Sequence, residues 1–184
     1  MKSEVTFGRA DLRQEAEHRT FLKLSQEYFE WMDEEITQLC GFTIASIANM
    51  GLSDYVAHTV GLATQIGQDE GGIYFLRDAA GNAAAMGGLR RLPSGGAEIV
   101  RIYTRPQYRG GGHGWTMVQS LIGEARRLGY RELFLDTGVF MKSAQKIYRE
   151  AGFSACAPYA GAEPPEALMP YWLYLKRSLE HISA

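Results

Sequence analysis

The glycine-rich stretch "RGGGHG" at residues 109–114 constrains the fold more than any other part of this sequence. It stands between "AEIVRIYT" (97–104), which alternates like a strand, and "WTMVQSLIGEARRL" (115–128), which has helical spacing. Glycine costs a helix about 1 kcal/mol per residue relative to alanine, so a glycine run at the mouth of a helix requires an explanation. We interpret it as a sharp strand-to-helix turn whose backbone is closely approached by something outside the chain.

Such a turn predicts an anion-binding site. The first N–H groups of a helix have no intrahelical acceptor, and the positive end of the helix dipole lies beside them. Without side chains at Gly110, Gly112 and Gly114, a phosphate or pyrophosphate can reach these N–H groups, and Arg109 adds a positive charge at the rim. A flexible turn is the alternative, although an ordinary turn needs only one or two glycines.

Spacing separates this stretch from two other phosphate-binding loops. The Walker loop requires G-x-x-x-x-G-K-[ST], whereas "WT" follows Gly114 and there is no lysine. The dinucleotide fingerprint requires G-x-G-x-x-G, and no glycine stands at the sixth place counted from Gly110 or Gly112. The pattern that fits is R-x-x-G-x-G, formed by Arg109, Gly112 and Gly114.

The rest of the chain predicts a single α+β domain over residues 1–184. Apolar residues three and four apart indicate an amphipathic helix within 11–36, and a second helix is expected to begin at Asp54 as its N-cap. A strand meander and then a strand–helix–strand–helix–strand order imply a mixed sheet with helices on its faces. The expected strands cover 71–78, 83–92, 97–104, 131–137 and 169–179, and the later helices cover 115–128 and 141–151.

Charge and composition exclude several classes of partner. The formal net charge of −2 gives no bulk electrostatic reason to bind nucleic acid or an acidic membrane. Cys40 and Cys156 have neither metal-ligand spacing nor a disulfide-framework count, so no metal is expected. The chain opens without a basic segment followed by an apolar run, and no apolar window is long enough to span a bilayer. A cytoplasmic location is the expectation.

Two motifs give the sequence a resemblance to a known family. "EIVRIYTRPQYRGGGHG" (98–114) resembles the acyl-CoA binding motif of the GNAT superfamily of N-acetyltransferases. "AQKIYREAGF" (144–153) resembles the later A-x-x-[IL]-Y-x-x-x-G-F element of that family, and the similarity covers roughly residues 71–177. The resemblance implies a mixed, mostly antiparallel sheet flanked by helices, with acyl-CoA wedged between two splayed parallel strands. Residues 71–177 would form the acyl-CoA-binding core, and residues 1–70 a helical part on the substrate side.

The resemblance also implies a place for acetyl-CoA, which would be the cosubstrate. Its pyrophosphate would rest on main-chain N–H groups of the loop and helix start, and its pantetheine arm along the preceding strand. The expected cofactor-binding residues are Ile102, Tyr103, Thr104, Arg109, Gly110, Gly111, Gly112, His113, Gly114 and Trp115. His113 is expected to be an exposed loop residue, and Trp115 to pack against the core or against the edge of the cofactor.

The implied reaction is acyl transfer from a thioester to an amine. Tyr148 stands at the tyrosine position of the family and would be the general acid to the leaving sulfur; an amphipathic core tyrosine is the alternative. Glu98 would be the base, or else a strand-end carboxylate paired with Arg90 or Arg91. Asp136 is a second candidate for the base, a holder of the substrate ammonium, or a turn cap. A main-chain N–H near Tyr103 would stabilise the oxyanion.

The sequence departs from the family pattern at Met141, where many relatives have an asparagine that contacts the cofactor. Lys142, Lys146 and Arg149 could meet the 3′-phosphate of CoA or form a solvated helix face. The acceptor pocket would lie between residues 28–35 and residues 159–172. An acidic cluster on the first helix could attract an ammonium group or simply be solvated: Glu27, Glu30, Asp33, Glu34 and Glu35.

The expected function is therefore acetyl transfer from acetyl-CoA to a primary amine, of a small molecule, by direct attack in a ternary complex. A non-catalytic acyl-CoA-binding or sensing module on the same fold is the alternative, and a nucleotide-phosphate module is a third. No nucleic acid or membrane partner is expected, and a homodimer is left open.

Overall fold

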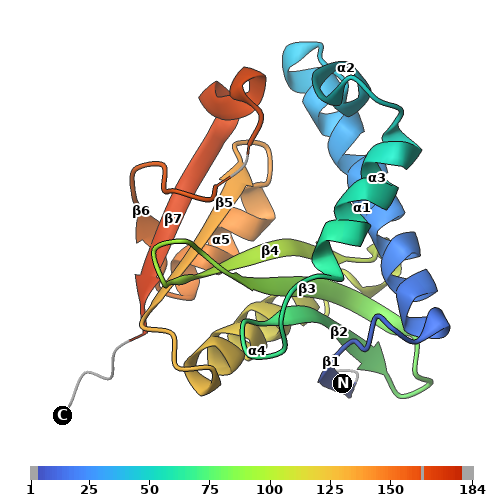
Figure 1. Ribbon diagram of the computed structural model, residues 1–184, viewed down its shortest axis with the longest axis vertical. Coiled ribbons are helices and arrows are strands. Elements are labelled where there is room, and N and C mark those ends of the chain that lie inside the picture. The colour runs from blue at the N-terminus through green and yellow to red at the C-terminus, as the bar shows by residue number, and fades with distance from the viewer. Residues whose placement is uncertain (1–3, 163, 180–184) are drawn as a thin grey trace.

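The computed structural model describes residues 4–162 and 164–179. Its strands and helices follow one another in an order that begins with a strand, continues with three helices and then three strands, and alternates only after β4 (Ala97–Thr104) (Figure 1). The elements are β1 (Val5–Arg9), α1 (Glu15–Cys40), α2 (Ile44–Ala48), α3 (Leu52–Ala63), β2 (Gly72–Asp78), β3 (Ala83–Arg91), β4 (Ala97–Thr104), the 3-10 turn η1 (Pro106–Tyr108), α4 (His113–Arg127), β5 (Glu132–Gly138), α5 (Lys142–Glu150), β6 (Ser154–Ala155), the 3-10 turn η2 (Glu166–Tyr171) and β7 (Trp172–Ser178).

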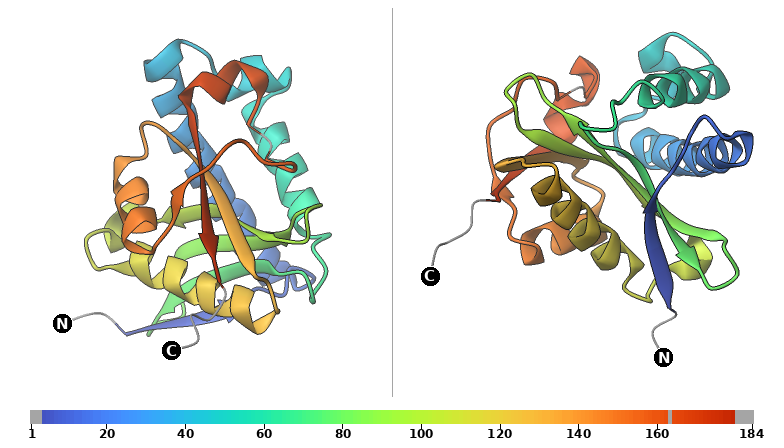
Figure 2. Two further views of the ribbon diagram at one scale, coloured as in Figure 1. Left: turned by 90° about the vertical axis from the view of Figure 1, so that its left-hand side faces the viewer. Right: turned by 60° about the horizontal axis from the view of Figure 1, so that its bottom comes forward.

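The strands that the structure describes form one sheet in the order β1-β2-β3-β4-β5-β7-β6. Neighbouring strands pair antiparallel except β4 and β5, which run parallel. The right-hand view of Figure 2 shows α1 and α3 on one face of the sheet, and α4 and α5 on the other. Each face has its own apolar core, one built on Phe21, Leu24 and Ile36 of α1 and the other on Met117 and Leu121 of α4. The predicted mixed, mostly antiparallel sheet is confirmed.

The parallel pair at the centre of the sheet is very short. β4 and β5 are paired at Ala97 with Leu133 and at Glu98 with Phe134. Beyond these pairs β4 continues through residues 99–104 and β5 through residues 135–138, with no further pairing between them within the described chain. The sheet therefore opens into two halves that part at Glu98.

β4 also carries a bulge just beyond this point. Val100 pairs with Gly88 and Tyr103 with Met86, so Arg101 and Ile102 together oppose the single residue between those two partners. Arg101 has φ +58°, in the left-handed region that non-glycine residues rarely adopt. A bulge of this kind bends its strand and changes the direction of the side chains that follow.

The end of α5 explains the second sequence motif. Gly152 follows α5 at φ +82°, its amide donates to the carbonyl of Arg149 (3.0 Å), and the amide of Phe153 donates to the carbonyl of Tyr148 (3.0 Å). These are the two bonds of a Schellman cap, in which the residue after the glycine packs back on the last turn. The rings of Phe153 and Tyr148 are 6.2 Å apart. The "Y-x-x-x-G-F" pattern is thus a helix stop as well as a family signature.

Several elements on the N-terminal side differ from those expected from the sequence. Asp54 is not an N-cap, because α3 begins at Leu52 with Gly51 as its cap and Asp54 lies in its first turn. β1 and α2 were not predicted, so the part before residue 71 also supplies a strand to the sheet. β1 is a five-residue edge strand that contains Gly8, and such a strand gives only a weak alternating signal.

Candidate functional site

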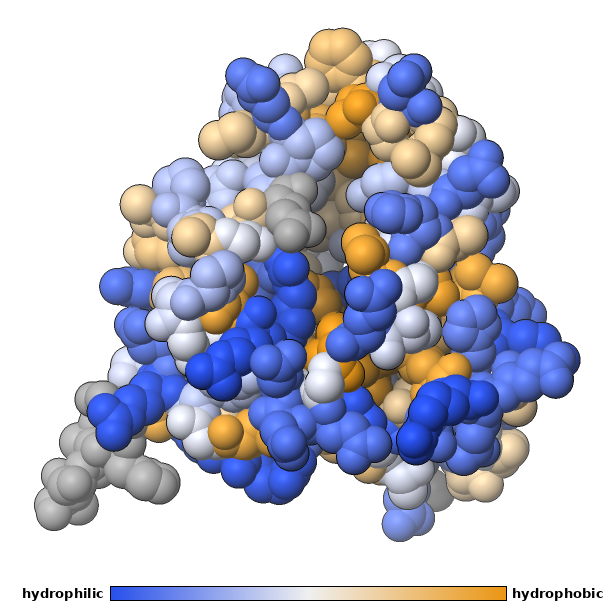
Figure 3. Space-filling model, viewed as in Figure 1, coloured by the Kyte–Doolittle hydropathy of each residue, from blue (hydrophilic) through white to orange (hydrophobic). Residues whose placement is uncertain are grey.

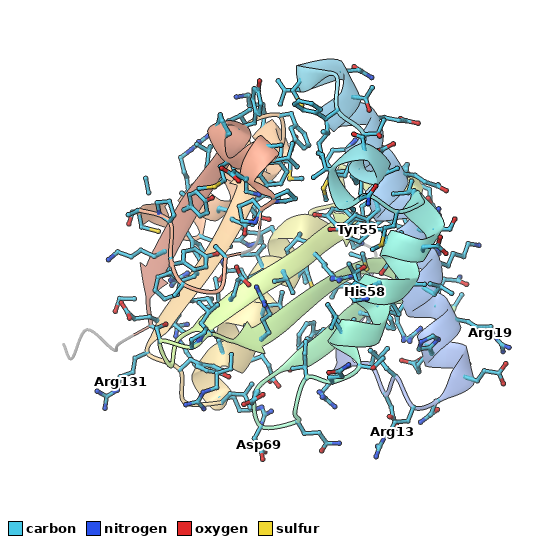
Figure 4. The ribbon with its side chains drawn as sticks, turned by 45° about the horizontal axis from the view of Figure 1, so that its top comes forward. Arg13, Arg19, Tyr55, His58, Asp69 and Arg131 are labelled. Atoms are coloured by element: carbon cyan, nitrogen blue, oxygen red, sulfur yellow. The ribbon has the colours of Figure 1, made fainter. Side chains whose placement is uncertain are left out.

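The parting of β4 and β5 forms the floor of a cleft of about 1090 Å³. Side chains from α1 and α3 line one wall, and the start of α4 together with α5 lines the other. Figure 3 shows apolar side chains gathered in the middle of this face, between groups of polar ones. Figure 4 labels Tyr55 on α3, one of the residues that line the cleft.

The glycine turn leaves the start of α4 bare. Gly110 has φ +80° and Gly112, the N-cap of α4, has φ +82°, and a Cβ added at either position would meet nothing within 4 Å. The amide of Thr116 bonds the carbonyl of Gly112 (3.0 Å), while the amides before it belong to the first turn, which has no intrahelical acceptor. Gly110, Gly112, Gly114 and Arg109 all line the cleft. These residues fit a phosphate group, which needs clustered N–H donors and open space before them.

The loop that leads to this helix start is tied down at both ends. The guanidinium of Arg105 donates to both carboxylate oxygens of Glu27 on α1 (3.0 and 2.8 Å), and its amide donates to the carbonyl of Ala84 (3.0 Å). The hydroxyl of Tyr108 donates to Asp78 (2.6 Å). The loop is therefore held in place before any ligand binds, which lowers the entropic cost of binding.

Replacing Glu27 with glutamine is expected to loosen this loop. The substitution removes a partly buried carboxylate and leaves the Arg105 guanidinium without its charge partner, so we expect the free energy of unfolding to fall by about 1–2 kcal/mol. Urea unfolding measures that loss, and calorimetry should show CoA affinity falling several-fold. Glu30→Gln is the matched control, because Glu30 lies one turn further along α1, is exposed, and accepts a bond from Gln26 (2.7 Å). Equal effects of the two substitutions would contradict the role of Glu27.

His113 lies differently from the expectation. His113 is buried, not an exposed loop residue, because α4 begins at His113 and its ring folds back over the turn. Its Nδ1–H donates to the carbonyl of Tyr108 (2.8 Å), and a Cβ at Gly111 would lie 2.7 Å from the ring. Trp115 is 39% exposed and lines the cleft, so of its two expected positions the core is excluded, and contact with the edge of the cofactor stays a prediction.

Glu98 is buried at the point where the strands part. It is 1% exposed, accepts a bond from Nε of Arg90 at Oε2 (2.6 Å), and accepts one from the hydroxyl of Tyr159 at Oε1 (2.6 Å). Arg90 also donates to the carbonyl of Gly161 (2.6 Å), which fastens the loop before β7 to the sheet. The pairing with Arg90 that was the alternative for Glu98 is therefore present. Burial nevertheless outweighs these contacts and raises the pKa of Glu98 to about 7.

Tyr148 and Asp136 line the cleft from α5 and β5. Tyr148 is 6% exposed, and burial raises the pKa of its hydroxyl well above the ordinary value. One carboxylate oxygen of Asp136 accepts a bond from the indole N–H of Trp172 on β7 (2.8 Å). The structure thus brings Glu98, Asp136 and Tyr148 to the same cleft as the bare start of α4.

Three of the five residues in the acidic cluster on α1 have structural partners. Glu27 pairs with Arg105, Glu30 accepts from Gln26, and Asp33 accepts from the amide of Ile44 at the start of α2 (2.5 Å). On α5, Lys142 and Lys146 line the cleft, whereas Arg149 lies on the exposed side. Met141 also lines the cleft, and its sulfur accepts a bond from Thr137 (3.4 Å).

Arg101 lines the cleft and was not expected there from the sequence. The spacing of two isoleucines in the sequence reflects the bulge. Ile99 and Ile102 are three residues apart, and both pack on the α4 side of the sheet. Strict alternation would place them on opposite faces, so this spacing marks an extra residue in the strand. Arg101 is turned to the α1 side by that extra residue.

The architecture matches that of acyl-CoA N-acyltransferases, and comparison with known proteins agrees. A family model described as the acetyltransferase (GNAT) family matches residues 7–153. This chain therefore belongs to the GNAT acetyltransferase family.

Individual relatives and solved structures support the assignment. The chain is 29% identical over 101 residues to an IAA acetyltransferase from Azospirillum brasilense, covering 54% of this chain and 63% of the relative. It is 33% identical over 96 residues to an uncharacterized N-acetyltransferase from Schizosaccharomyces pombe, covering 50% and 58%. The matches thus span less than two thirds of these relatives.

Two solved structures share the fold over nearly the whole chain. A GNAT-family acetyltransferase from Staphylococcus aureus superposes with a TM-score of 0.67 at 14% identity, covering 96% of this chain and 100% of that one. The yncA protein from Salmonella typhimurium, solved with its cofactor acetyl-CoA, superposes with a TM-score of 0.60 at 16% identity, covering 99% and 98%. Among the described residues, no helix has the length and apolar composition needed to cross a membrane.

Proposed function

We propose that this protein transfers the acetyl group of acetyl-CoA to the nitrogen of a primary amine, of a small molecule, in a ternary complex. The observation that carries the proposal is one continuous cleft that joins a bare helix start to three ionisable side chains, Glu98, Asp136 and Tyr148. Phosphate recognition and proton transfer are the two abilities that this reaction demands of a protein. Family membership and the acetyl-CoA in the yncA structure support the choice of cosubstrate.

The cosubstrate would bind through main chain. The amides of residues 109–115 would receive the pyrophosphate, and the strand around Ile102, Tyr103 and Thr104 would receive the pantetheine arm. The bulge in β4 supports this second contact, because it interrupts the ladder to β3 and so frees main-chain groups for a ligand. An amide near Tyr103 would stabilise the oxyanion that forms during transfer.

Glu98 would take the proton that the amine must lose. An alkyl amine has a pKa of roughly 10 and is mostly protonated at neutral pH, so a base is required. With a pKa of about 7, Glu98 is ionised at slightly alkaline pH and remains basic enough to accept a proton. Asp136, further along β5, would hold the ammonium form as it enters. The free amine then attacks the thioester carbonyl, which forms the C–N bond and the tetrahedral oxyanion. Collapse of the oxyanion breaks the C–S bond and releases the thiolate, and the second proton of the nitrogen passes to water.

Tyr148 would donate a hydrogen bond to the leaving sulfur. Because its pKa is raised, the hydroxyl keeps its proton at neutral pH, and full transfer to a thiolate of pKa about 8.5 would be uphill. Its contribution is therefore stabilisation of the thiolate as the C–S bond lengthens.

Tyr148→Phe is expected to lower kcat by about 10²-fold, the usual cost of losing one donor to a developing anion. CoA affinity should stay near that of the wild type, because the phosphate contacts lie on α4. Steady-state thiol release and calorimetry measure the two quantities. Tyr174→Phe is the control, because Tyr174 is a buried tyrosine on β7 outside the cleft lining. An unchanged kcat in Tyr148→Phe would make Tyr148 the core residue that packs on Phe153.

A panel of primary amines tests the function as a whole. With acetyl-CoA present, thiol release that depends on the amine, together with an acetylated product in the mass spectrum, would support the transferase. Binding of CoA without turnover of any amine would favour the acyl-CoA-binding module. The two-sided pairing of Glu98 with Arg90 and Tyr159 is the observation on the side of that alternative.

A further inference from the structure

Arg101 presents a charge to the cleft that acetyl transfer itself does not require. The bulge keeps two consecutive residues of β4 on the α1 side of the sheet. Val100 lies beside Gly88 together with Ile73, which belongs to the core under α1, and Arg101 reaches α3. Nη2 of Arg101 donates to the carbonyl of Thr59 on α3 (2.9 Å). The left-handed φ of Arg101 costs roughly 1–3 kcal/mol in a non-glycine residue, so the surrounding structure holds this arginine in place against a local strain.

The guanidinium lies in mostly apolar surroundings. Its Cζ atom lies 5.6 Å from the ring centroid of Phe21 and 5.5 Å from that of Phe29, both on α1. Its Nη1 atom is fully buried and has no hydrogen-bond partner among the described residues. No ion pair joins Arg101 to a carboxylate within residues 4–162 and 164–179. Burial lowers the pKa of Arg101, as expected for a cation that lacks a counter-charge.

A buried cation without a counter-charge is unfavourable to folding, and a neutral side chain of similar volume would remove the penalty. The arginine nevertheless remains half-buried at the lining of the cleft, where a ligand can reach the side chain. Nearby ionisable groups are the hydroxyls of Tyr28 and Tyr55 and the guanidinium of Arg90. None of these supplies a negative charge at neutral pH, so no counter-charge for Arg101 comes from residues 4–162 or 164–179.

We propose that the acceptor amine also carries a carboxylate, and that Arg101 binds this carboxylate at the α1–α3 end of the cleft. The inference rests on the proposed acetyl transfer and names its substrate class as amino acids. Glu98 and Asp136 are the acidic groups on the floor of the same cleft, which suits the ammonium end. A zwitterion with its carboxylate at Arg101 and its ammonium toward the acidic pair matches both charges, whereas a simple amine would leave Arg101 unpaired.

The chemistry of the wall between these charges favours an apolar amino-acid side chain. Tyr28, Phe29, Trp31 and Tyr55 line the cleft on this side, and Phe140 and Trp172 line it from the other half of the sheet. The ring centroids of Trp31 and Phe140 are 6.0 Å apart, and those of Phe140 and Trp172 are 5.9 Å apart. Phenylalanine is therefore a suitable probe.

The test compares three acceptors that differ only at the carboxylate: L-phenylalanine, L-phenylalaninamide and 2-phenylethylamine. For the wild type we expect kcat/KM for phenylalanine to exceed that for the amide by at least about tenfold, the value of a charge-assisted hydrogen bond, after correction for the fraction of free amine. In Arg101→Gln this ratio should fall to about one, and Arg101→Lys should keep part of it. Arg91→Gln, an exposed arginine at the cleft rim, should keep the full ratio.

A binding measurement separates this inference from the proposed function. With CoA present, 3-phenylpropanoate, which has a carboxylate and no amine, should raise the melting temperature of the wild type and leave that of Arg101→Gln unchanged. Protection with no turnover of any amine would leave the carboxylate site standing and remove the transferase. Absence of protection, or equal activity on the acid and the amide, would overturn the carboxylate site whatever the enzyme acetylates.

Discussion

Gly112→Val is expected to weaken the binding of acetyl-CoA at least roughly 100-fold, because two or more charge-assisted hydrogen bonds would be lost. A Cβ at this position points into open space beside the first turn of α4, where the phosphates would lie. A branched side chain there excludes the ligand sterically and covers the amides. Isothermal titration calorimetry with CoA measures the change directly.

Backbone strain has to be separated from steric exclusion, because valine tolerates φ +82° poorly. Gly129 supplies a matched control at the opposite end of the same helix. Its φ is +81°, and a Cβ added there also meets nothing within 4 Å. Gly129→Val should lower the melting temperature about as much as Gly112→Val and keep CoA affinity. Equal loss of affinity in both variants would move the phosphate site away from the glycine turn.

Glu98→Gln is expected to lower kcat by about 10²–10⁴-fold, the range that general acid–base catalysis contributes. In the wild type, kcat/KM should rise with pH through a midpoint near 7, where Glu98 loses its proton. That limb should be absent from Glu98→Gln and present in Asp136→Asn, so the pH profile distinguishes the two carboxylates. A limb near pH 7 that survives in Glu98→Gln would assign the base elsewhere.

The same pKa sets the sign of a stability effect. Burial raises the pKa of Glu98 from 4.5 to about 7, so the folded state binds this proton more tightly than the unfolded chain does. Its contribution to stability is complete below about pH 4.5 and is lost as the pH rises through 7. The free energy of unfolding of the wild type, relative to Glu98→Gln, should therefore fall between pH 5 and 8. A rise would mean that the ion pair with Arg90 governs Glu98 instead.

The parts of the fold that depend on local chemistry could be predicted from the sequence. The strand over 97–104 was placed at the bounds that β4 has, and the helices expected over 115–128 and 141–151 end within one residue of the ends of α4 and α5, where Gly129 and Gly152 follow. Glycine at a left-handed position after an apolar helix is a local signal, and it survives without knowledge of the rest of the chain. The glycine turn before α4 was predicted on the same grounds.

The parts that depend on distant contacts could not be predicted. The partner of Arg105 is Glu27, far away in the sequence, so Glu27 looked like one member of a solvated acidic face. His113 followed several glycines and therefore looked exposed, although its own ring fills the space over Gly111. The orientation of Arg101 depends on pairing with β3, which shifts the alternation by one residue. Such features emerge only when strands and helices meet.

The Schellman cap of α5 holds the ring of Tyr148 in one direction, because the cap places Phe153 against that ring. Phe153 packs against the ring of Tyr148, and Phe153 is placed there by Gly152, which lies outside the cleft lining. Each residue of a helix adds a rotation of about 100°. A helix stop displaced by one residue would therefore no longer place a phenylalanine against the ring of Tyr148, and the direction of that ring would change. The position at which the helix stops therefore sets the direction of the tyrosine that is proposed to act on the leaving sulfur.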